Sequence, residues 1–179
     1  RINFLAEDRF DLKFAGKELA RDMKGPTRRS WEKLKHLGRY LIGKKRVVLR
    51  MKWQRAQKKL RTYSDSDWAG CALTRKSSSC AVVMLGSHCI RSGSSTQATP
   101  SMSSGEAEFN AGVRAASIGL GSCAFAADLG GSLSLELGMD SSAALGMFRR
   151  SGLGRVRHIA VPLMWIQDAV KKGRVALFK

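Results

Sequence analysis

The hydrophobic pattern of the first third of the chain has the spacing of helices. Over residues 5–23, apolar side chains recur at intervals of three and four, which predicts an amphipathic helix. Thr27 or Ser30 can cap a second helix, which carries one apolar stripe and ends at Gly43. Both predicted helices carry Lys and Arg on the outer face, and neither is expected to fold alone.

After the second helix, the apolar residues alternate with polar ones, which is the period of half-buried strands. Residues 47–54 show this alternation and predict a strand, and residues 60–68 predict another. A hairpin is predicted from residues 80–85 and 88–91, with its turn at Gly86-Ser87. The middle of the chain therefore favours a sheet.

The second half of the chain alternates helices with short strands. A Ser-rich loop over 92–104 leads into a long Ala-rich helix over 104–128, for which Ser103 and Glu106 fit a capping box. The other predicted elements are a strand over 133–140, helices over 144–148 and 158–172, and a strand over 174–178. This order is typical of an α/β layer with a mixed sheet.

The interior of the long helix contains Gly112, Gly119 and Gly121. Each costs roughly 1 kcal/mol relative to alanine in a helix interior. Close packing against a sheet would explain them, and relaxed selection would explain them equally.

The net charge of +18 changes the picture, because it is concentrated at one end of the chain. Residues 1–62 carry a net charge of +14, and residues 63–179 carry +4. A basic segment of this kind is typical of a phosphate-binding surface with strongly salt-dependent affinity, and a solubilising surface is the alternative. We therefore expect nucleic acid to contact Arg46, Arg50, Lys52, Arg55, Lys58, Lys59, Arg61, Arg75 and Lys76.

Polar side chains near the predicted sheet offer further contacts. Residues 77–79 and 95–97 carry hydroxyl and amide groups that suit a sugar–phosphate backbone. A solvated Ser-rich loop is an equally open interpretation.

The cysteines and the apolar runs bear on the cellular location to be expected for the protein. The four cysteines form no C-x-x-C pair and complete no zinc spacing with histidine, so we expect free thiols of an intracellular protein. No apolar run approaches the roughly 20 residues that cross a bilayer, and the charged start is not a signal peptide. A cytoplasmic or nuclear location is expected, without secretion. The first residue is Arg, which favours a piece of a longer protein.

Acidic residues are scarce after residue 62, so their positions are informative. Asp65 and Asp140 end predicted strands, and Glu108 lies in the first turns of the long helix. Carboxylates that converge from separate elements can hold magnesium, and two such ions about 3.5–4 Å apart promote phosphodiester hydrolysis. From spacing alone, solvated carboxylates at strand ends are the commoner outcome.

Five ordered motifs change that interpretation: YSDSDWAG, TRKSSSC, SGEAEFNAG, GMDSSAAL and VRHIAV. Their letters, order and spacing resemble the ribonuclease H domain of copia-type LTR retrotransposons. The earlier stretches LAEDRFDLKFAGKELARDM and PTRRSWEKLKHLGRYLIG resemble the thumb-side end of the reverse transcriptase in the same Pol polyprotein.

The resemblance implies an organisation and a fold. It places a helical end of reverse transcriptase at 1–45 and a ribonuclease H-like domain at 46–179. The implied fold is α/β and ribonuclease H-like: a five-stranded mixed sheet flanked by helices and preceded by a small helical segment. The catalytic Asp pair of the polymerase would lie upstream, so these residues alone would not polymerise DNA.

The resemblance also implies an activity, which is hydrolysis of the RNA strand of an RNA–DNA hybrid by four carboxylates and two Mg²⁺ ions. Mn²⁺ is a possible substitute. The matching positions are Asp65, Glu108 and Asp140, which we expect to be catalytic and to bind metal. The family places a fourth Asp two residues after His158, where this chain has Ala160. His158 is expected to assist catalysis by positioning the substrate or releasing the product.

Three functions stay open on the sequence. The first is a magnesium-dependent hybrid ribonuclease that is impaired by Ala160. The second is a non-catalytic basic clamp that holds duplex for the upstream reverse transcriptase domain, and the third is a degenerate remnant. The expected partners are an RNA–DNA hybrid or another duplex and that upstream domain, with no membrane.

Overall fold

The structure, a computed structural model, describes residues 2–152, 154 and 163–179. The chain forms two compact units, one of residues 1–52 with 93–95 and the other of residues 53–92 with 96–179. The domain boundary expected at residues 45 and 46 stays a prediction. Among the described helices, none is both long enough and apolar enough to span a bilayer.

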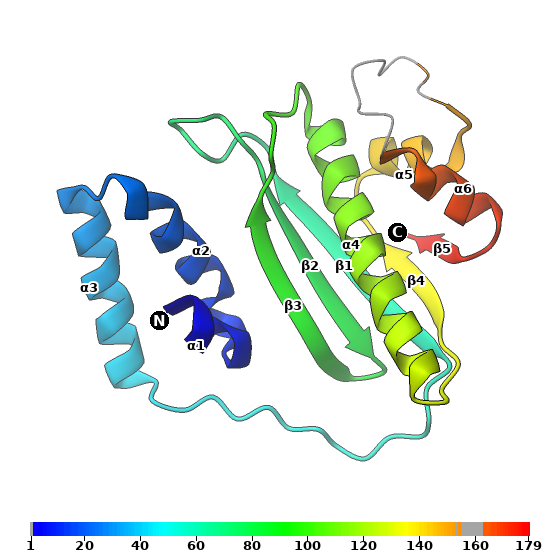
Figure 1. The fold of residues 1–179 in the computed structure, drawn as a ribbon, viewed down its shortest axis with the longest axis horizontal. Helices are drawn as coiled ribbons and strands as arrows, with labels where there is room; N and C mark the ends of the chain where they lie inside the picture. The colour runs from blue at the N-terminus through cyan, green and yellow to red at the C-terminus, as the bar shows by residue number, and fades with distance from the viewer. Residues whose placement is uncertain (1, 153, 155–162) are drawn as a thin grey trace. The chain divides into compact units, whose positions relative to one another are not determined.

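The N-terminal unit is built from helices (Figure 1). Its elements are α1 (Ile2–Asp8), a 3₁₀ turn (Phe10–Leu12), α2 (Lys13–Arg21), a second 3₁₀ turn (Asp22–Lys24) and α3 (Arg28–Gly43). Thr27 caps α3, because its hydroxyl accepts from the Ser30 N–H and the Ser30 hydroxyl accepts from the Thr27 N–H. Apolar contacts among Ala6, Leu12 and Leu37 form the small core of this unit.

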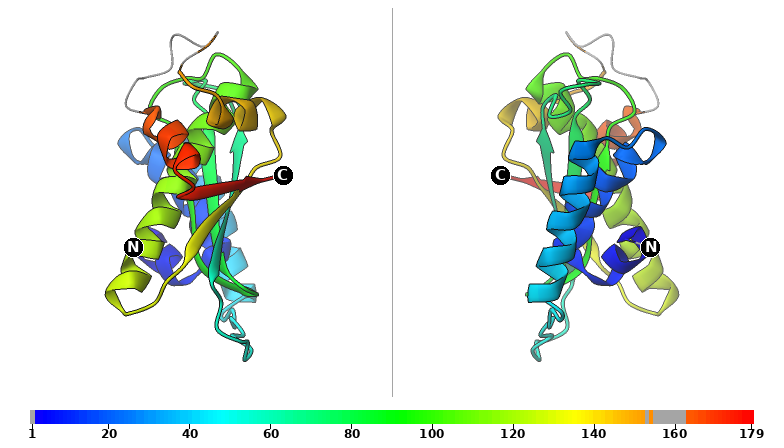
Figure 2. Two further views of the ribbon diagram at one scale, coloured as in Figure 1. Left: turned by 90° about the vertical axis from the view of Figure 1, so that its right-hand side faces the viewer. Right: turned by 90° about the vertical axis from the view of Figure 1, so that its left-hand side faces the viewer.

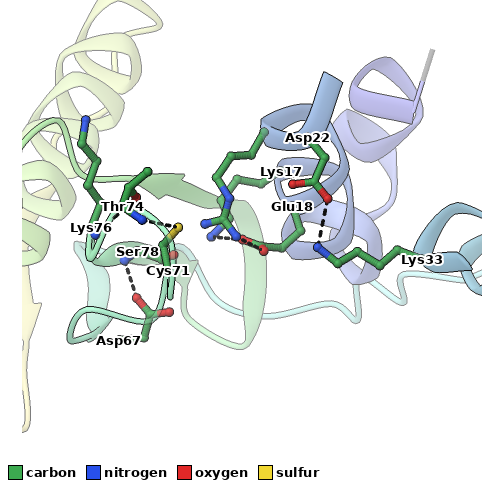
Figure 3. A network of polar contacts seen from close by, with 10 residues as sticks. Lys17, Glu18, Asp22, Lys33, Asp67, Cys71, Thr74, Lys76 and Ser78 are labelled. Atoms are coloured by element: carbon green, nitrogen blue, oxygen red, sulfur yellow. Dashed lines mark hydrogen bonds and ion pairs between the residues drawn. The ribbon is translucent and has the colours of Figure 1, made fainter. Parts of the chain in front are cut away.

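The single helix predicted over 5–23 is wrong, because Arg9 interrupts it in an extended conformation. The Arg9 guanidinium donates to both carboxylate oxygens of Asp11, at 2.9 and 2.7 Å, and to the Lys44 carbonyl at 3.2 Å. Tyr40 also donates to Asp11, at 2.7 Å. The bond from Arg9, helped by the bond from Tyr40, lowers the pKa of Asp11 to about 2. A separate ion pair joins Lys33 to Asp22 at 3.0 Å (Figure 3).

The strand predicted over 47–54 is also wrong. Residues 44–57 have no regular secondary structure, and Val48 and Trp53 are 76% and 88% exposed. An alternating pattern forms a strand only where another strand can satisfy its backbone groups. The next strand along the chain, β1 (Lys59–Asp67), already has a partner on each side.

The second unit contains one mixed sheet of five strands in the order β3-β2-β1-β4-β5. The remaining strands are β2 (Ser78–Leu85), β3 (His88–Thr96), β4 (Ser134–Gly138) and β5 (Val175–Phe178). β2 runs antiparallel to β1, whereas β4 runs parallel to both β1 and β5. With its flanking helices and the helical segment before it, this sheet confirms the predicted ribonuclease H-like fold class.

The long helix α4 (Ser104–Asp128) lies along one face of the sheet (Figures 1 and 2). α5 (Ser142–Arg149) contacts α4, and α6 (Trp165–Lys171) contacts α5 and β5. The core between these layers includes Phe109 and Phe148, whose rings meet edge to face with centroids 5.2 Å apart. Burial of this apolar surface is what holds the helices on the sheet.

Two of the interior glycines of α4, Gly112 and Gly119, lie where the helix packs closely against the sheet. A Cβ at Gly112 would be 2.5 Å from the Met139 sulfur, and one at Gly119 would be 2.5 Å from a Leu135 methyl carbon. A Cβ at Gly121 would meet nothing within 4 Å. Close packing therefore explains Gly112 and Gly119, and nothing in the structure explains Gly121.

We expect Gly112→Ala to lower the free energy of unfolding by about 1–3 kcal/mol, because overpacking of a dense core outweighs the better helix propensity of alanine. Gly121→Ala is the matched control and is expected to raise it by about 1 kcal/mol. Urea unfolding of the full chain measures both changes. Equal effects of the two substitutions would contradict the packing explanation.

The low pKa of Asp11 predicts a pH dependence in the N-terminal unit. Because the folded-state pKa lies below the ordinary value of 3.8, the ionised carboxylate stabilises the fold above about pH 4. This contribution is lost as the pH falls from about 4 to about 2. Asp11→Asn is expected to lower the free energy of unfolding at pH 7 and to flatten the profile between pH 4 and 2.

Urea unfolding at a series of pH values tests this expectation. Glu32→Gln is the control, because the Glu32–Arg28 contact of 3.5 Å is exposed and contributes little. An Asp11→Asn profile that keeps the wild-type slope below pH 4 would rule out this role for Asp11.

Candidate active site

Three acidic side chains from three elements converge beside the C-terminal end of β1. Asp65 belongs to β1, Glu108 to the second turn of α4, and Asp140 follows β4 by two residues. One carboxylate oxygen from each residue lies within 4.8 Å of the other two. In the part of the chain that the structure describes, this is the only acidic, His or Cys cluster of that kind.

The strand register explains why Asp65 and Asp140 meet. β1 and β4 are parallel, and Tyr63 is paired with Gly138. Asp65 and Asp140 each follow this pair by two residues, so they emerge at the same edge of the sheet. α4 packs across both strands and brings Glu108 to that edge. The convergence expected from the sequence is present, while the metal-binding and catalytic roles of the three residues stay predictions.

Glu108 is held by one of its two carboxylate oxygens. Ser66 donates to Oε1 from its backbone N–H at 3.1 Å and from its hydroxyl at 2.8 Å. The other oxygen, Oε2, is buried and has no hydrogen-bond partner among the described residues. Burial, reinforced by the negative charges of Asp65 and Asp140, raises the pKa of Glu108, and the two bonds from Ser66 oppose that rise.

This arrangement fits a hard divalent cation. A buried carboxylate oxygen without a partner is costly, and like charges whose oxygens lie within 4.8 Å of one another repel. A cation bound by all three residues would relieve both penalties. Oxygen donors alone suit Mg²⁺ or Mn²⁺ rather than a metal that prefers sulfur or nitrogen.

Two neighbouring acids are engaged elsewhere. Asp67 accepts a hydrogen bond from the Ser78 N–H across the turn between β1 and β2 (Figure 3). Glu106 donates its N–H to the Ser103 hydroxyl at 3.2 Å, and its carboxylate accepts from the Met102 N–H at 2.7 Å. Both acids therefore have local structural tasks, and the Glu106 contacts agree with its interpretation as a cap residue.

His158 and Ala160 lie outside the described residues. The expected part of His158 in catalysis and the expected gap at Ala160 therefore stay predictions from the sequence.

The expected nucleic-acid contacts fall into groups. The first five, Arg46, Arg50, Lys52, Arg55 and Lys58, are exposed and belong to the irregular segment before β1. Lys59 and Arg61 instead bind Glu136 of β4, at 2.6 and 2.9 Å, and these bonds lower the Glu136 pKa. Arg75 is exposed and Lys76 is half-buried. The role of all nine in binding nucleic acid stays a prediction.

The polar residues expected to contact a sugar–phosphate backbone are partly misassigned. Ser77 is completely buried, and Ser79 and Gln97 are 3% and 9% exposed. Ser77 accepts from the Ala69 N–H, and the Gln97 amide donates to Ser79. Sequence reasoning also missed Ser66, although its place between two aspartates of β1 was a usable signal.

Comparison with known proteins places the chain in a class. No family model matches it. The Pol polyprotein from transposon RE2 of Arabidopsis thaliana, described as retrovirus-related, is 31% identical over 96% of the chain. Its RE1 counterpart from the same organism is 29% identical over the same share. The chain spans 12% of the length of each relative.

These matches confirm the relationship expected from the sequence motifs: the chain is homologous to a segment of copia-type retrotransposon Pol polyproteins. Its second unit is a ribonuclease H-like domain.

Solved structures that align with this chain include LC11-RNase H1, isolated from compost by a metagenomic approach. It has a TM-score of 0.44 and 14% identity, over 68% of this chain and 84% of that one. The N-terminal ribonuclease H domain of a Mycobacterium tuberculosis protein has a TM-score of 0.43 and 16% identity, over 68% and 81%.

A metal titration tests the acidic cluster directly. We expect MgCl₂ or MnCl₂ to raise the melting temperature at pH 7, because a cation that binds only the folded state stabilises it by mass action. Glu108→Gln keeps Oε1 as an acceptor for Ser66 but removes the charge. Since the raised pKa means that the ionised form destabilises the fold at pH 7, this variant should match or exceed the wild-type melting temperature without metal. It should lose the metal-dependent rise.

Glu136→Gln is the matched control, and its expected change in melting temperature without metal is opposite to that of Glu108→Gln. Because Lys59 and Arg61 lower the pKa of Glu136, its loss should reduce the melting temperature and leave the metal-dependent rise intact. A rise that survives in Glu108→Gln would exclude Glu108 as a ligand.

Proposed function

We propose that the second unit binds an RNA–DNA hybrid and hydrolyses the RNA strand by two-metal catalysis, at a rate reduced by loss of the fourth carboxylate. The observation that carries this proposal is the convergence of Asp65, Glu108 and Asp140, with Glu108 Oε2 buried and unpartnered among the described residues. The homology to retrotransposon Pol polyproteins supports the choice of substrate class.

The three residues differ in what they contribute. Asp65 and Asp140 are exposed, so their side of the cluster is open to a phosphodiester. Glu108 is buried behind them and fixed by Ser66, which defines the geometry of the cluster. Divalent cations, when bound, supply an activated water and stabilise the leaving oxygen.

The proposed impairment concerns Ala160, which lies outside the described residues. Ala160 stands where the family has its fourth Asp, so one metal ligand is missing from the set. Loss of a group from a catalytic set typically lowers the rate by orders of magnitude. His158 is proposed to position the substrate or to assist product release.

Substrate binding is proposed to depend on the exposed basic residues before β1. Neutralised phosphates release counterions, so affinity should fall steeply with salt and should be largely independent of sequence. The same residues favour a second candidate function, a non-catalytic clamp that holds duplex for the upstream reverse transcriptase domain without cutting it. A degenerate remnant is the remaining alternative.

A labelled RNA–DNA hybrid, incubated with MgCl₂ or MnCl₂, tests the proposed activity. We expect weak cleavage by the wild-type chain, none by Asp65→Asn, and at least about a tenfold gain in Ala160→Asp, because that substitution restores the missing ligand. Denaturing gel electrophoresis of the labelled RNA measures the rates.

Binding of the same hybrid is measured in parallel over a range of salt concentrations. An Ala160→Asp variant that cuts no faster than wild type would refute the account of the impairment. Binding without cleavage in both chains would favour the clamp.

A further inference from the structure

A buried glutamine, Gln97, is hydrogen-bonded to β2, to the loop before α4 and to the start of α4. We propose that Gln97 is a positioning residue, which fixes the start of α4, and with it Glu108, relative to the end of β1. The proposal rests on the proposed function, because it concerns the same cation site. Gln97 itself does not contact the acidic cluster, so it would act through Ala107 and Glu108.

The side-chain amide of Gln97 uses both kinds of hydrogen-bonding atom. Its Nε2 donates to the Ser79 hydroxyl at 3.0 Å and to the Ala107 carbonyl at 2.9 Å. Its Oε1 accepts from the Ser101 hydroxyl at 2.8 Å. The backbone N–H of Gln97 donates to the Ser77 carbonyl at 2.8 Å. One buried residue thus joins β2, the loop before α4 and α4 itself.

These bonds continue to the end of β1. Ser101 accepts, at its carbonyl, a hydrogen bond of 3.1 Å from the Trp68 indole, and Trp68 directly follows the last residue of β1. At the other end of the path, Ala107 directly precedes Glu108. The path from Trp68 through Ser101 and Gln97 to Ala107 therefore connects the strand that carries Asp65 with the turn of α4 that carries Glu108.

The site needs this second connection because Ser66 holds only one oxygen of Glu108. A side chain held at one oxygen can still shift when its helix shifts, whereas metal ligands need their positions fixed closely. Loss of the Gln97 amide would leave the buried hydroxyls of Ser79 and Ser101 with fewer partners and would free the start of α4 to move. The expected consequence is weaker cation binding in addition to lower stability.

The same unit offers a matched control in a second buried glutamine. Gln167 is 5% exposed, and its Nε2 donates to the carbonyls of Met147 and Gly152, at 2.8 and 3.1 Å. Its Oε1 accepts from the Gly152 N–H at 2.8 Å. These bonds join α6 to α5 and to Gly152 and do not involve β1 or α4. Substitution of Gln167 therefore reports the general cost of losing a buried amide.

The experiment compares Gln97→Met with Gln167→Met in the full chain. Melting temperatures are measured in EDTA and across a MnCl₂ titration. The half-point is the MnCl₂ concentration at which half of the metal-dependent rise in melting temperature is reached. Both variants should melt at a lower temperature than wild type in EDTA. Gln97→Met should raise the half-point at least about tenfold, as is typical for residues that orient metal ligands, and Gln167→Met should change it less than about twofold.

Smaller changes keep the test informative if Gln97→Met does not unfold cooperatively. Ser101→Ala removes one bond of Gln97 and should raise the half-point several-fold. Ser122→Ala, which removes a hydroxyl bonded to the Ile118 carbonyl of α4 at 2.9 Å, should leave it unchanged.

Two results overturn the proposal in different ways. A wild-type half-point in Gln97→Met, or in Ser101→Ala where that variant replaces it, would show that Gln97 contributes stability alone. A wild-type chain without any metal-dependent rise would remove the cation site itself, and the proposed two-metal activity would fail with it.

Discussion

The burial of Glu108 against the end of β1 is the constraint on which the candidate site depends. An ionised carboxylate at this position loses water, faces two other carboxylates and keeps hydrogen bonds only at Oε1. The chain tolerates this cost because α4 is fixed on the sheet by a large apolar core, and Ser66 holds Glu108 at Oε1. Stability elsewhere in the unit therefore maintains a locally unfavourable arrangement of charge.

The close approach of α4 to the sheet follows from the same constraint. Gly112 and Gly119 remove the side chains that would otherwise separate the helix from Met139 and Leu135. Glycine lowers the helix propensity at these positions, but it allows the close packing by which the N-terminal turns of α4 reach the edge where β1 and β4 end. Gly112 and Gly119 thus belong to the geometry that brings an acid of α4 to the two acids of the sheet.

Much of the second unit could be predicted from the sequence. Alternation over 133–140 and the capping box before the long helix identified both elements, because one has a buried face on a sheet and the other a local N-terminal signal. The strand predicted over 47–54 failed because alternation reports only a tendency, and residues 44–57 have no regular secondary structure. The break at Arg9 was missed because it depends on bonds to Asp11 and Lys44, the latter distant in the sequence.

The candidate site was predictable to a different degree. Its three acids were identifiable from motifs, because the motifs preserve the letters around them. Their surroundings were not: Lys59 and Arg61, two expected phosphate contacts, both pair with Glu136 of the neighbouring strand, and Gln97 is buried although its segment is rich in polar residues. Pairing across strands and burial of an amide are properties of the folded chain that local composition does not report.

The central claim is that Asp65, Glu108 and Asp140 form one cation site. The most direct test is an anomalous-difference map from a crystal of this chain soaked in MnCl₂. The account predicts a manganese peak within coordination distance of a carboxylate oxygen from each residue, with Glu108 Oε1 still bonded to Ser66. A map without a peak at the cluster, in a crystal where Glu108 keeps its place, would contradict it.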